Sequence, residues 1–365
     1  MTRSLSLDTE FVWQSTYSAK LGLVQAMPAG GLSAPLSPAD GAGLIRFDSR
    51  EPRHERIRLI DPLACDGADL APLVADSDVV KIFHAAGQDL DYISRWCGAR
   101  FANIYDTSLA ARFCGWKGQP SLQKLLLETL GVELKKDSTL TNWLKRPLSQ
   151  RQLDYALDDV AYLPELADFL NDKAQSAGTL GWMLEATREF EFEAQAPEAP
   201  GQIWRRVKRL PISAFRKPRQ LVLLRELAET RERLAIREDL PRNWVLDDSV
   251  IIAASLNPDT FTWQPVAKNI PRNLAPELET AFAAALEMPF ENLPEIATKF
   301  DDIPKEKVAR VVDAVAKSAE RHGIDATVIG PRAMCADYCA APENPDHKFN
   351  RGWRKELLAD YLRSI

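Results

Sequence analysis

From Leu5 to about Ala167, short β-rich runs alternate with stretches of helical pattern. The run from Val79 to Phe83, for example, is followed by a helical pattern from Asp89 to Trp96. Chains in which strands and helices alternate form a sheet with helices packed against it. The first half of the chain is therefore expected to be an α/β domain.

Three β-rich runs come before any long helical pattern, at residues 6–11, 21–25 and 58–60. They are expected to form a meander that opens a mixed sheet. Between the second and third runs, residues 27–57 contain many prolines and glycines, which interrupt regular elements. This segment predicts a long loop with a short strand at Leu44 to Asp48. It is either a tolerated surface insertion or a lid over a site.

A domain boundary is expected at residues 185–200, where glutamates and prolines are concentrated. Beyond it the pattern is helical, with amphipathic stretches at residues 219–237, 274–286 and 305–321. A chain of 365 residues also exceeds the size at which one hydrophobic core keeps growing. We expect an α/β domain followed by two small all-α bundles, with these bounds: residues 1–190, 203–285 and 286–365.

Composition excludes several classes of protein. With 45% hydrophobic and 27% charged residues the chain is close to the average for globular proteins. Neither a membrane-spanning apolar run nor a signal-peptide core occurs in the sequence, so a cytoplasmic protein without membrane contact is expected. The five cysteines contain no CxxC pair, which argues against a disulfide framework or a zinc ribbon. The net charge of -6 means that any nucleic-acid site must be local.

Two carboxylates, Asp8 and Glu10, lie two residues apart in the first β-rich run, so both point to the same face of the sheet. Acids placed side by side repel each other, and a hard divalent cation with oxygen ligands relieves that repulsion. The alternative is that the pair belongs to the polar face of an exposed edge strand.

A further acid, Asp89 or Asp91, follows the point where the apolar run ending at Phe83 gives way to a helical pattern. Site residues of α/β proteins collect at strand ends. However, an acid in the first turn of a helix commonly serves only to cap the helix or to satisfy its dipole. Position in the sequence does not separate Asp89 from Asp91.

A helix is predicted from Leu148 to Phe169, because Ser149 and Gln152 form a capping-box pattern at its start. Tyr155 and Asp159, four residues apart, share a face that points away from the apolar side of this helix. A phenol and a carboxylate placed in this way can hold a metal ion and position its bound water. Alternatively, they belong to a solvated helix face.

Three segments resemble, in this order, the three motifs of the DEDD superfamily of exonucleases, tyrosine subtype: residues 8–11 (DTEF), 84–90 (HAAGQDL) and 155–159 (YALDD). More specifically, the first 170 residues resemble the ribonuclease D family, because further segments recur in the family's order. Those segments are residues 16–17, 21–25, 59–63, 106–107, 121–122 and 143–148. The motif alignment selects Asp89 over Asp91, and Asp159 over Asp158.

The helical half resembles the helicase-and-RNase-D C-terminal (HRDC) domain over residues 203–285. A second, divergent copy is expected over residues 286–365, supported by the similarity of residues 351–358 to the closing helix of ribonuclease D chains. All five motif residues precede position 160, so a fragment ending near residue 200 is expected to degrade short single-stranded RNA if it folds.

The resemblance implies a ribonuclease H-like fold and a 3′-to-5′ exoribonuclease that releases nucleoside 5′-monophosphates. It assigns two divalent metal ions, Mg²⁺ or Mn²⁺, to four acids: Asp8, Glu10, Asp89 and Asp159. One ion would generate the attacking hydroxide and the other would stabilise the leaving 3′ oxygen. Tyr155 would orient the attacking water or help to deprotonate it.

The implied substrate is RNA with a free 3′ end, tRNA precursors in particular, and a monomer is expected. Phe11, His84 and Gln88 are candidate substrate contacts within the motifs. The sequence departs from the family pattern in having only seven residues before Asp8, in the segment 27–57 and at Asn142, where the family tends to carry Asp. None of these departures removes a proposed metal ligand.

A basic patch lies between residues 204 and 219, which contain seven cations and no acid. The cations that we consider candidate RNA contacts are Arg205, Arg206, Lys208 and Arg209. They either contact phosphates or serve as a solvated helix start or as salt-bridge partners.

Three other functions compete with this one. The order of the motifs does not distinguish RNA from DNA, so a 3′-to-5′ DNA exonuclease is the nearest alternative. A catalytically silent RNA-binding scaffold is disfavoured because all five motif residues are present. A helicase is disfavoured because the sequence has no phosphate-binding G-x-x-x-x-G-K-[ST] loop.

Overall fold

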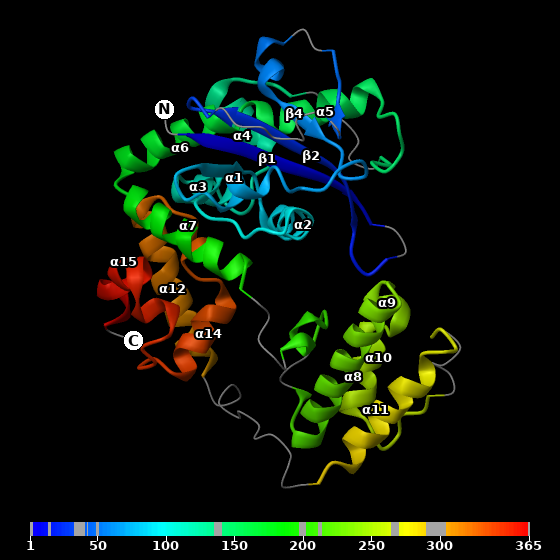
Figure 1. Ribbon diagram of the computed structural model, residues 1–365. Coiled ribbons are helices and arrows are strands. Elements are labelled where there is room, and N and C mark those ends of the chain that lie inside the picture. The colour runs from blue at the N-terminus through cyan, green and yellow to red at the C-terminus, as the bar shows by residue number, and fades with distance from the viewer. Residues whose placement is uncertain are drawn as a thin grey trace. The chain divides into compact units, whose positions relative to one another are not determined.

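The computed structural model describes residues 3–13, 16–32, 41, 43–48, 51–134, 141–196, 202–210, 214–263, 270–289 and 304–363. The chain divides into two compact units (Figure 1). The first, which we call the sheet unit, comprises Met1–Val12, Lys20–Ala196 and Ile303–Ile365. The second, the helical unit, comprises Trp13–Ala19 and Pro197–Asp302.

The sheet unit contains a six-stranded sheet of order β3-β4-β2-β1-β5-β6. Its strands are β1 (Ser4–Val12), β2 (Lys20–Ala29), β3 (Leu44–Ile45), β4 (Arg58–Ile60), β5 (Val80–Phe83) and β6 (Ile104–Asp106). The pairs β1–β2, β2–β4 and β3–β4 are antiparallel, whereas β1–β5 and β5–β6 are parallel. The predicted meander and mixed sheet are therefore confirmed.

Helices cover both faces of this sheet. Those of the first half are α1 (Ala71–Ala75), α2 (Gly87–Cys97), α3 (Thr107–Phe113), α4 (Leu122–Leu130), α5 (Gln150–Ala161), α6 (Leu163–Ala177) and α7 (Leu180–Ala194). In Figure 1, α4, α5 and α6 lie on one side of β1 and β2, and α1 and α2 lie on the other. Each face of the sheet has its own hydrophobic core. On β5, Ile82 packs in the core that contains α5 and α6, whereas the next residue, Phe83, packs in the core that contains α2.

The single helix predicted from Leu148 to Phe169 is in fact two helices, α5 and α6, separated at Tyr162. The predicted start is confirmed, because Ser149 and Gln152 form the reciprocal capping box. The break follows from Pro164, which lies in the first turn of α6. Proline has no backbone N–H to continue the ladder of α5, and its ring clashes with the preceding turn.

The C-terminal helices belong to the sheet unit. They are α12 (Lys305–His322), α13 (Ala326–Ile329), α14 (Arg332–Ala340) and α15 (Gly352–Leu362). Trp353 of α15 is 1% exposed, and its ring centroid lies 5.2 Å from that of Phe113 in α3. Arg354 donates a hydrogen bond to the carbonyl of Ile329 at 2.8 Å and pairs with Glu189 of α7.

The compact units thus differ from the three ranges expected from the sequence, because residues 303–365 share one core with α3, α6 and α7. Each large apolar side chain contributes about 1.5–3 kcal/mol when buried. Exposing several of them would cancel a typical total stability of about 5–15 kcal/mol. A fragment ending near residue 200 would expose this core, so we expect that it folds poorly. That a folded fragment keeps the chemistry stays a prediction.

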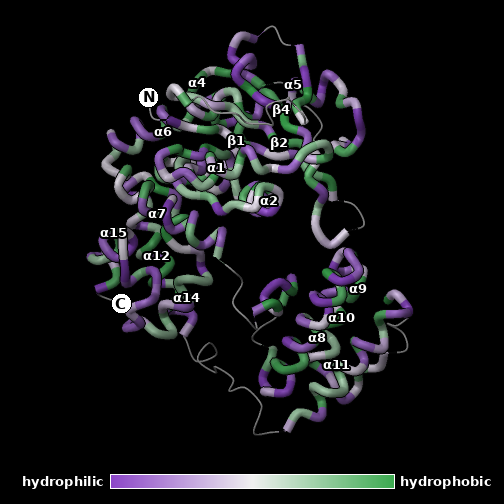
Figure 2. The backbone as a smooth tube through the Cα atoms, in the orientation of Figure 1, coloured by the Kyte–Doolittle hydropathy of each residue, from purple (hydrophilic) through white to green (hydrophobic). Residues whose placement is uncertain are grey.

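The helical unit is built on a long central helix. Its elements are a short 3-10 helix (Ile203–Arg206), α8 (Pro218–Arg237), α9 (Arg242–Val245), α10 (Asp248–Leu256) and α11 (Ala275–Glu287). Figure 2 shows both hydrophobic and hydrophilic residues along α8 and α11, as expected for amphipathic helices. Their buried side chains, including Leu227 and Leu278, form a core of their own. No helix of the described residues is long and apolar enough to cross a membrane.

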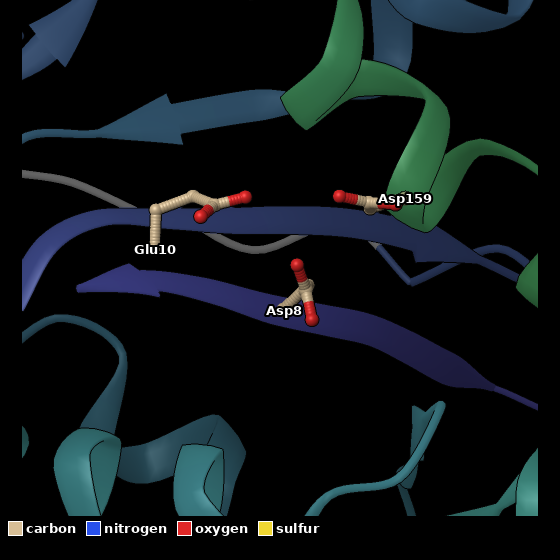
Figure 3. A group of neighbouring side chains, drawn as sticks. All are labelled: Asp8, Glu10 and Asp159. Carbon is tan, nitrogen blue, oxygen red and sulfur yellow. The ribbon is translucent and has the colours of Figure 1, made fainter. Parts of the chain in front are cut away.

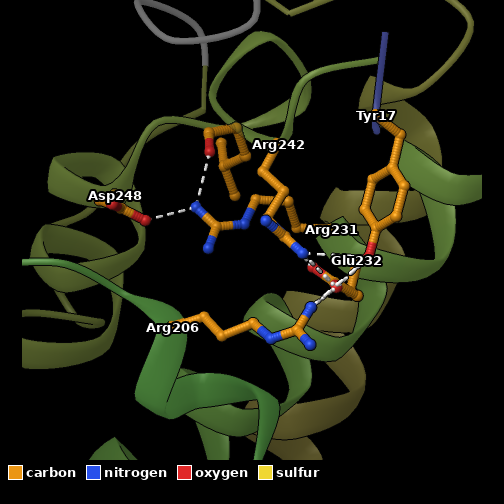
Figure 4. Close-up of polar contacts among 7 residues, drawn as sticks. Tyr17, Arg206, Arg231, Glu232, Arg242 and Asp248 are labelled. Carbon is orange, nitrogen blue, oxygen red and sulfur yellow. Dashed lines mark hydrogen bonds and ion pairs between the residues drawn. The ribbon is translucent and has the colours of Figure 1, made fainter. Parts of the chain in front are cut away.

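In the helical unit, the buried acid Glu232 lies among Tyr17, Arg206 and Arg242 (Figure 4). Glu232 of α8 is 3% exposed and accepts hydrogen bonds from Tyr17 Oη at 2.5 Å and from Arg242 at 2.5 and 2.9 Å. It also pairs with Arg206. Burial alone would raise the pKa of Glu232, but the hydrogen bonds from Arg242 and Tyr17 hold it below the usual value. Arg206 is therefore already engaged in an ion pair within the helical unit.

Candidate active site

Three acids converge between β1 and α5 (Figure 3). Asp8 and Glu10 project from β1 toward Asp159 of α5, and one carboxylate oxygen from each of the three lies within 4.8 Å of the others. The alternation along the strand is as predicted, because Phe11 turns the other way and packs on Tyr92 of α2 with ring centroids 4.8 Å apart. The pair of strand acids is thus brought together with the helix acid.

Asp89 approaches from the side of α2. Its side chain is 7% exposed, and its Oδ1 atom accepts a hydrogen bond from the hydroxyl of Thr9, the residue between the two strand acids. It acts electrostatically on Asp8, Glu10 and Asp159, although it is not one of the three acids whose oxygens gather most closely. Asp91, the alternative in the same helix, is exposed and pairs with Arg95.

The loop that leads from β5 to Asp89 is held by a carboxylate for which the sequence predicted no role. Asp106, at the end of β6, accepts hydrogen bonds from the backbone N–H groups of Ala85 at 3.1 Å and Ala86 at 2.9 Å. The same carboxylate caps α3 by accepting from Ser108 N at 2.8 Å. Ala85 has a φ of 65°, a left-handed conformation that costs energy for a residue with a side chain. The two bonds to Asp106 compensate for that strain.

Two of the predicted substrate contacts also lie on this loop and helix. The ring of His84 contacts Thr107 Oγ1 through Nδ1 at 2.9 Å and the carbonyl oxygen of Pro120 through Nε2 at 3.0 Å. Burial lowers the pKa of His84. Both ring nitrogens of His84 therefore have hydrogen-bond partners in the protein, and these contacts hold the loop that follows β5. Gln88, in the first turn of α2, is exposed.

Tyr155 lies beside the acids on α5, next to Trp143, whose ring centroid is 6.2 Å away. Trp143 is held by Arg146, which donates to its carbonyl at 2.7 Å and makes two bonds of 2.6 Å to Asp61. A Cβ atom at Gly22 would lie 2.8 Å from that of Trp143, so only glycine permits this approach to β2. The family-like segment 143–148 signalled this support in the sequence, but no role was predicted for it.

Asn142 does not disturb this arrangement. Its Oδ1 atom accepts a hydrogen bond from the backbone N–H of Leu144 at 3.0 Å. A carboxylate oxygen of Asp could accept the same bond, so the departure from the family pattern at this position preserves the local turn.

Burial, and to a lesser extent repulsion between carboxylates, disfavours ionisation of these acids. Burial, followed by repulsion from the other acids, raises the pKa of Asp8 well above its usual value and that of Glu10 to about 9. Burial is also the largest cause that raises the pKa of Asp159 to about 7 and that of Asp89 to about 6. Four converging carboxylates with only oxygen donors fit a hard divalent cation, whose charge would remove this repulsion.

This electrostatic arrangement predicts pH dependence. Unfolded Asp and Glu have pKa values of about 4, so in the metal-free protein these acids stabilise the folded state fully only below that pH. Their contribution is lost as the pH rises through the folded values of about 6, 7 and 9. We expect the Tm of EDTA-treated protein to fall between pH 5 and pH 9, more steeply than that of a Glu10→Gln variant.

Over the same range the apparent affinity for Mg²⁺, measured by calorimetry, should rise because protons compete with the cation for the acids. An Mg²⁺ affinity that does not change with pH would contradict the raised pKa values.

Comparison with known proteins places this site in a family. A sequence model described as 3′-5′ exonuclease matches residues 2–175. Ribonuclease D of Xanthomonas oryzae pv. oryzae is 31% identical over 90% of this chain and 84% of its own length. Ribonuclease D of Desulfotalea psychrophila is 29% identical over 99% of this chain and 92% of its own length.

The fold agrees. The crystal structure of Escherichia coli RNase D matches with a TM-score of 0.78 and 26% identity, covering 100% of this chain and 92% of that chain. The exonuclease match over residues 2–175 contains all five motif residues. The similarity to the ribonuclease D chains also extends over the helices that follow residue 175. The chain therefore belongs to the ribonuclease D family and is a 3′-to-5′ exoribonuclease.

Proposed function

We propose that Asp8, Glu10, Asp89 and Asp159 hold two divalent metal ions, Mg²⁺ or Mn²⁺, and that hydrolysis occurs there. The observation that carries this proposal is the convergence of partly buried, mutually repelling carboxylates on β1 and α5. When bound, the ions would supply a hydroxide nucleophile and stabilise the leaving 3′ oxygen. The hydrogen bond from the Thr9 hydroxyl holds the Asp89 carboxylate in place, so the side chain needs little movement to bind a metal ion.

Tyr155 is proposed to orient the attacking water. Burial and then the neighbouring Asp159 and Glu10 raise the pKa of its phenol. The phenol therefore stays protonated at neutral pH, which favours a hydrogen-bonding role over proton removal. Trp143 limits the movement of the Tyr155 ring from one side.

The proposed natural substrates are tRNA precursors and other small RNAs whose 3′ ends are trimmed. The relative from Escherichia coli is described as an exoribonuclease involved in structured RNA processing. To test this, one compares hydrolysis of a tRNA precursor that has a short 3′ extension with that of an unstructured RNA and a DNA of equal length. Trimming that stops near the mature tRNA end supports the proposal. Preferential hydrolysis of the DNA would favour the alternative nuclease.

The basic patch of the helical unit is proposed to contact RNA phosphates through Arg205, Lys208 and Arg209, whose side chains are exposed. Arg206 was predicted to join them, but its ion pair with Glu232 favours a salt-bridge role for this residue.

A triple variant with Gln at these three exposed positions should bind single-stranded RNA with a weaker dependence on salt. For every phosphate that is no longer neutralised, the negative slope of log affinity against log salt should become shallower by about 0.7. A matched control replaces Lys305, Arg310 and Lys355, exposed cations of the sheet unit, by Gln. Equal slopes for the two triple variants would assign the patch to a role other than RNA binding.

A further inference from the structure

Gln25 of β2 lies directly opposite Asp8 of β1 in the antiparallel ladder. Side chains that are directly opposite in such a ladder stand on the same face, with Cβ atoms about 4.5–5.5 Å apart. The face is the one covered by α5, because Leu23 and Met27, two residues to either side, pack in the same core as Leu157. The amide of Gln25 is therefore a neighbour of the acids, beneath α5.

This amide is fully buried and has no partner among the residues that the structure describes. Gln25 is 0% exposed, and neither its Oε1 nor its Nε2 atom makes a hydrogen bond there. Ser6, two residues before Asp8 on the same face, is also 0% exposed with an unpartnered hydroxyl. Native proteins rarely leave buried polar groups unpaired, so each such group calls for a partner.

Packing does not explain Gln25. Its same-face neighbours on β2 are apolar, and an apolar side chain of similar volume would fill the space without burying an amide. The partner that the face offers is Asp8, directly across the ladder. A carboxylate that binds a metal ion through one oxygen leaves further lone pairs, and neighbouring donors commonly hold such ligands in place.

We infer that Gln25 is a positioning residue for Asp8: its Nε2–H group donates a hydrogen bond to the Asp8 carboxylate in the metal-bound enzyme, directly or through one buried water that Ser6 also holds. The inference rests on the proposed metal site. It assigns to Gln25 no contact with the substrate or with the metal ions.

The replacement Gln25→Met separates this role from packing, because Met has nearly the same volume and no amide. Removing two unpartnered polar atoms should raise the Tm of the EDTA-treated protein. Removing the donor to a metal ligand should weaken Mn²⁺ binding by about 10–100-fold. A residue that only packs would not produce these opposite effects on stability and on metal affinity.

Ser255→Ala is the matched control. Ser255 of α10, in the helical unit, is also 0% exposed with an unpartnered hydroxyl. Its replacement should leave Mn²⁺ affinity unchanged. If Gln25→Met does not fold, as judged by circular dichroism, Gln25→Leu takes its place.

The experiment measures Mn²⁺ binding to the full-length chain by calorimetry, and by the dependence of Tm on Mn²⁺ concentration, without RNA. Weaker binding in Gln25→Met than in wild type and Ser255→Ala supports the inference. Equal Mn²⁺ affinities in all three proteins would overturn it. If the wild type itself binds no Mn²⁺, the proposed metal site fails, which is a different result from the failure of Gln25.

Discussion

Replacing Asp89 by Asn should lower the rate of RNA hydrolysis by about 100-fold or more, because it removes a charge that holds a metal ion and so costs several kcal/mol of transition-state stabilisation. The fold should be kept, because the Oδ1 atom of Asn can still accept the hydrogen bond from Thr9. At pH 8 the Tm of the EDTA-treated variant should equal or exceed that of wild type, because Asp89 is buried among other acids and its pKa is raised to about 6.

Asp91→Asn is the matched control, two residues away on the same helix. Asp91 is exposed and pairs with Arg95, and exposed pairs of this kind contribute about 0.3–0.5 kcal/mol. Its replacement should leave the rate of hydrolysis nearly unchanged. An Asp89→Asn variant that keeps more than about a tenth of the wild-type rate, or similar decreases in the two variants, would contradict the assignment of Asp89.

Tyr155→Phe should reduce turnover by roughly 100-fold while RNA affinity and Mn²⁺ affinity change little, the range expected for a group that positions a proton transfer. The variant keeps the ring that packs against Trp143 and removes only the hydroxyl. Single-turnover rates measured at saturating RNA separate the chemical step from binding. Normal turnover with weakened RNA binding would instead make Tyr155 a substrate contact.

The residues that we propose as catalytic could be singled out in the sequence because each lies in a short local pattern. Asp8 and Glu10 share a strand face, and Tyr155 and Asp159 share a helix face, so periodicity alone places each pair. Only the family resemblance placed the two pairs in one site, because a local sequence pattern does not show which strand a distant helix covers. The role of Asp106 was missed for the same reason, because its hydrogen bonds to Ala85 and Ala86 join residues that are far apart in the sequence.

The packing of the C-terminal helices could not be predicted from their pattern. An amphipathic helix such as α12 shows that it has an apolar face but not which core that face joins. Gln25 was equally hidden, because in the sequence it is a single polar residue in an apolar run. Only the strand register and the burial reveal it as a neighbour of Asp8.

The segment 27–57 is only partly described by the structure, since residues 33–40, 42, 49 and 50 lie outside the described ranges. The short strand predicted from Leu44 to Asp48 is present as β3, but it covers only Leu44–Ile45. Its role as a surface insertion or as a lid stays a prediction.

The proposed reaction is tested by following the hydrolysis of one RNA labelled at its 5′ end, with either a 3′-hydroxyl or a blocked 3′ end, in the presence of Mg²⁺ or EDTA. A metal-dependent 3′-to-5′ exoribonuclease should give a ladder that shortens stepwise from the free 3′ end, release nucleoside 5′-monophosphates, and show no hydrolysis in EDTA. Internal cleavage of the blocked RNA, release of nucleoside 3′-monophosphates, or equal rates in EDTA would contradict a metal-dependent 3′-to-5′ exoribonuclease site.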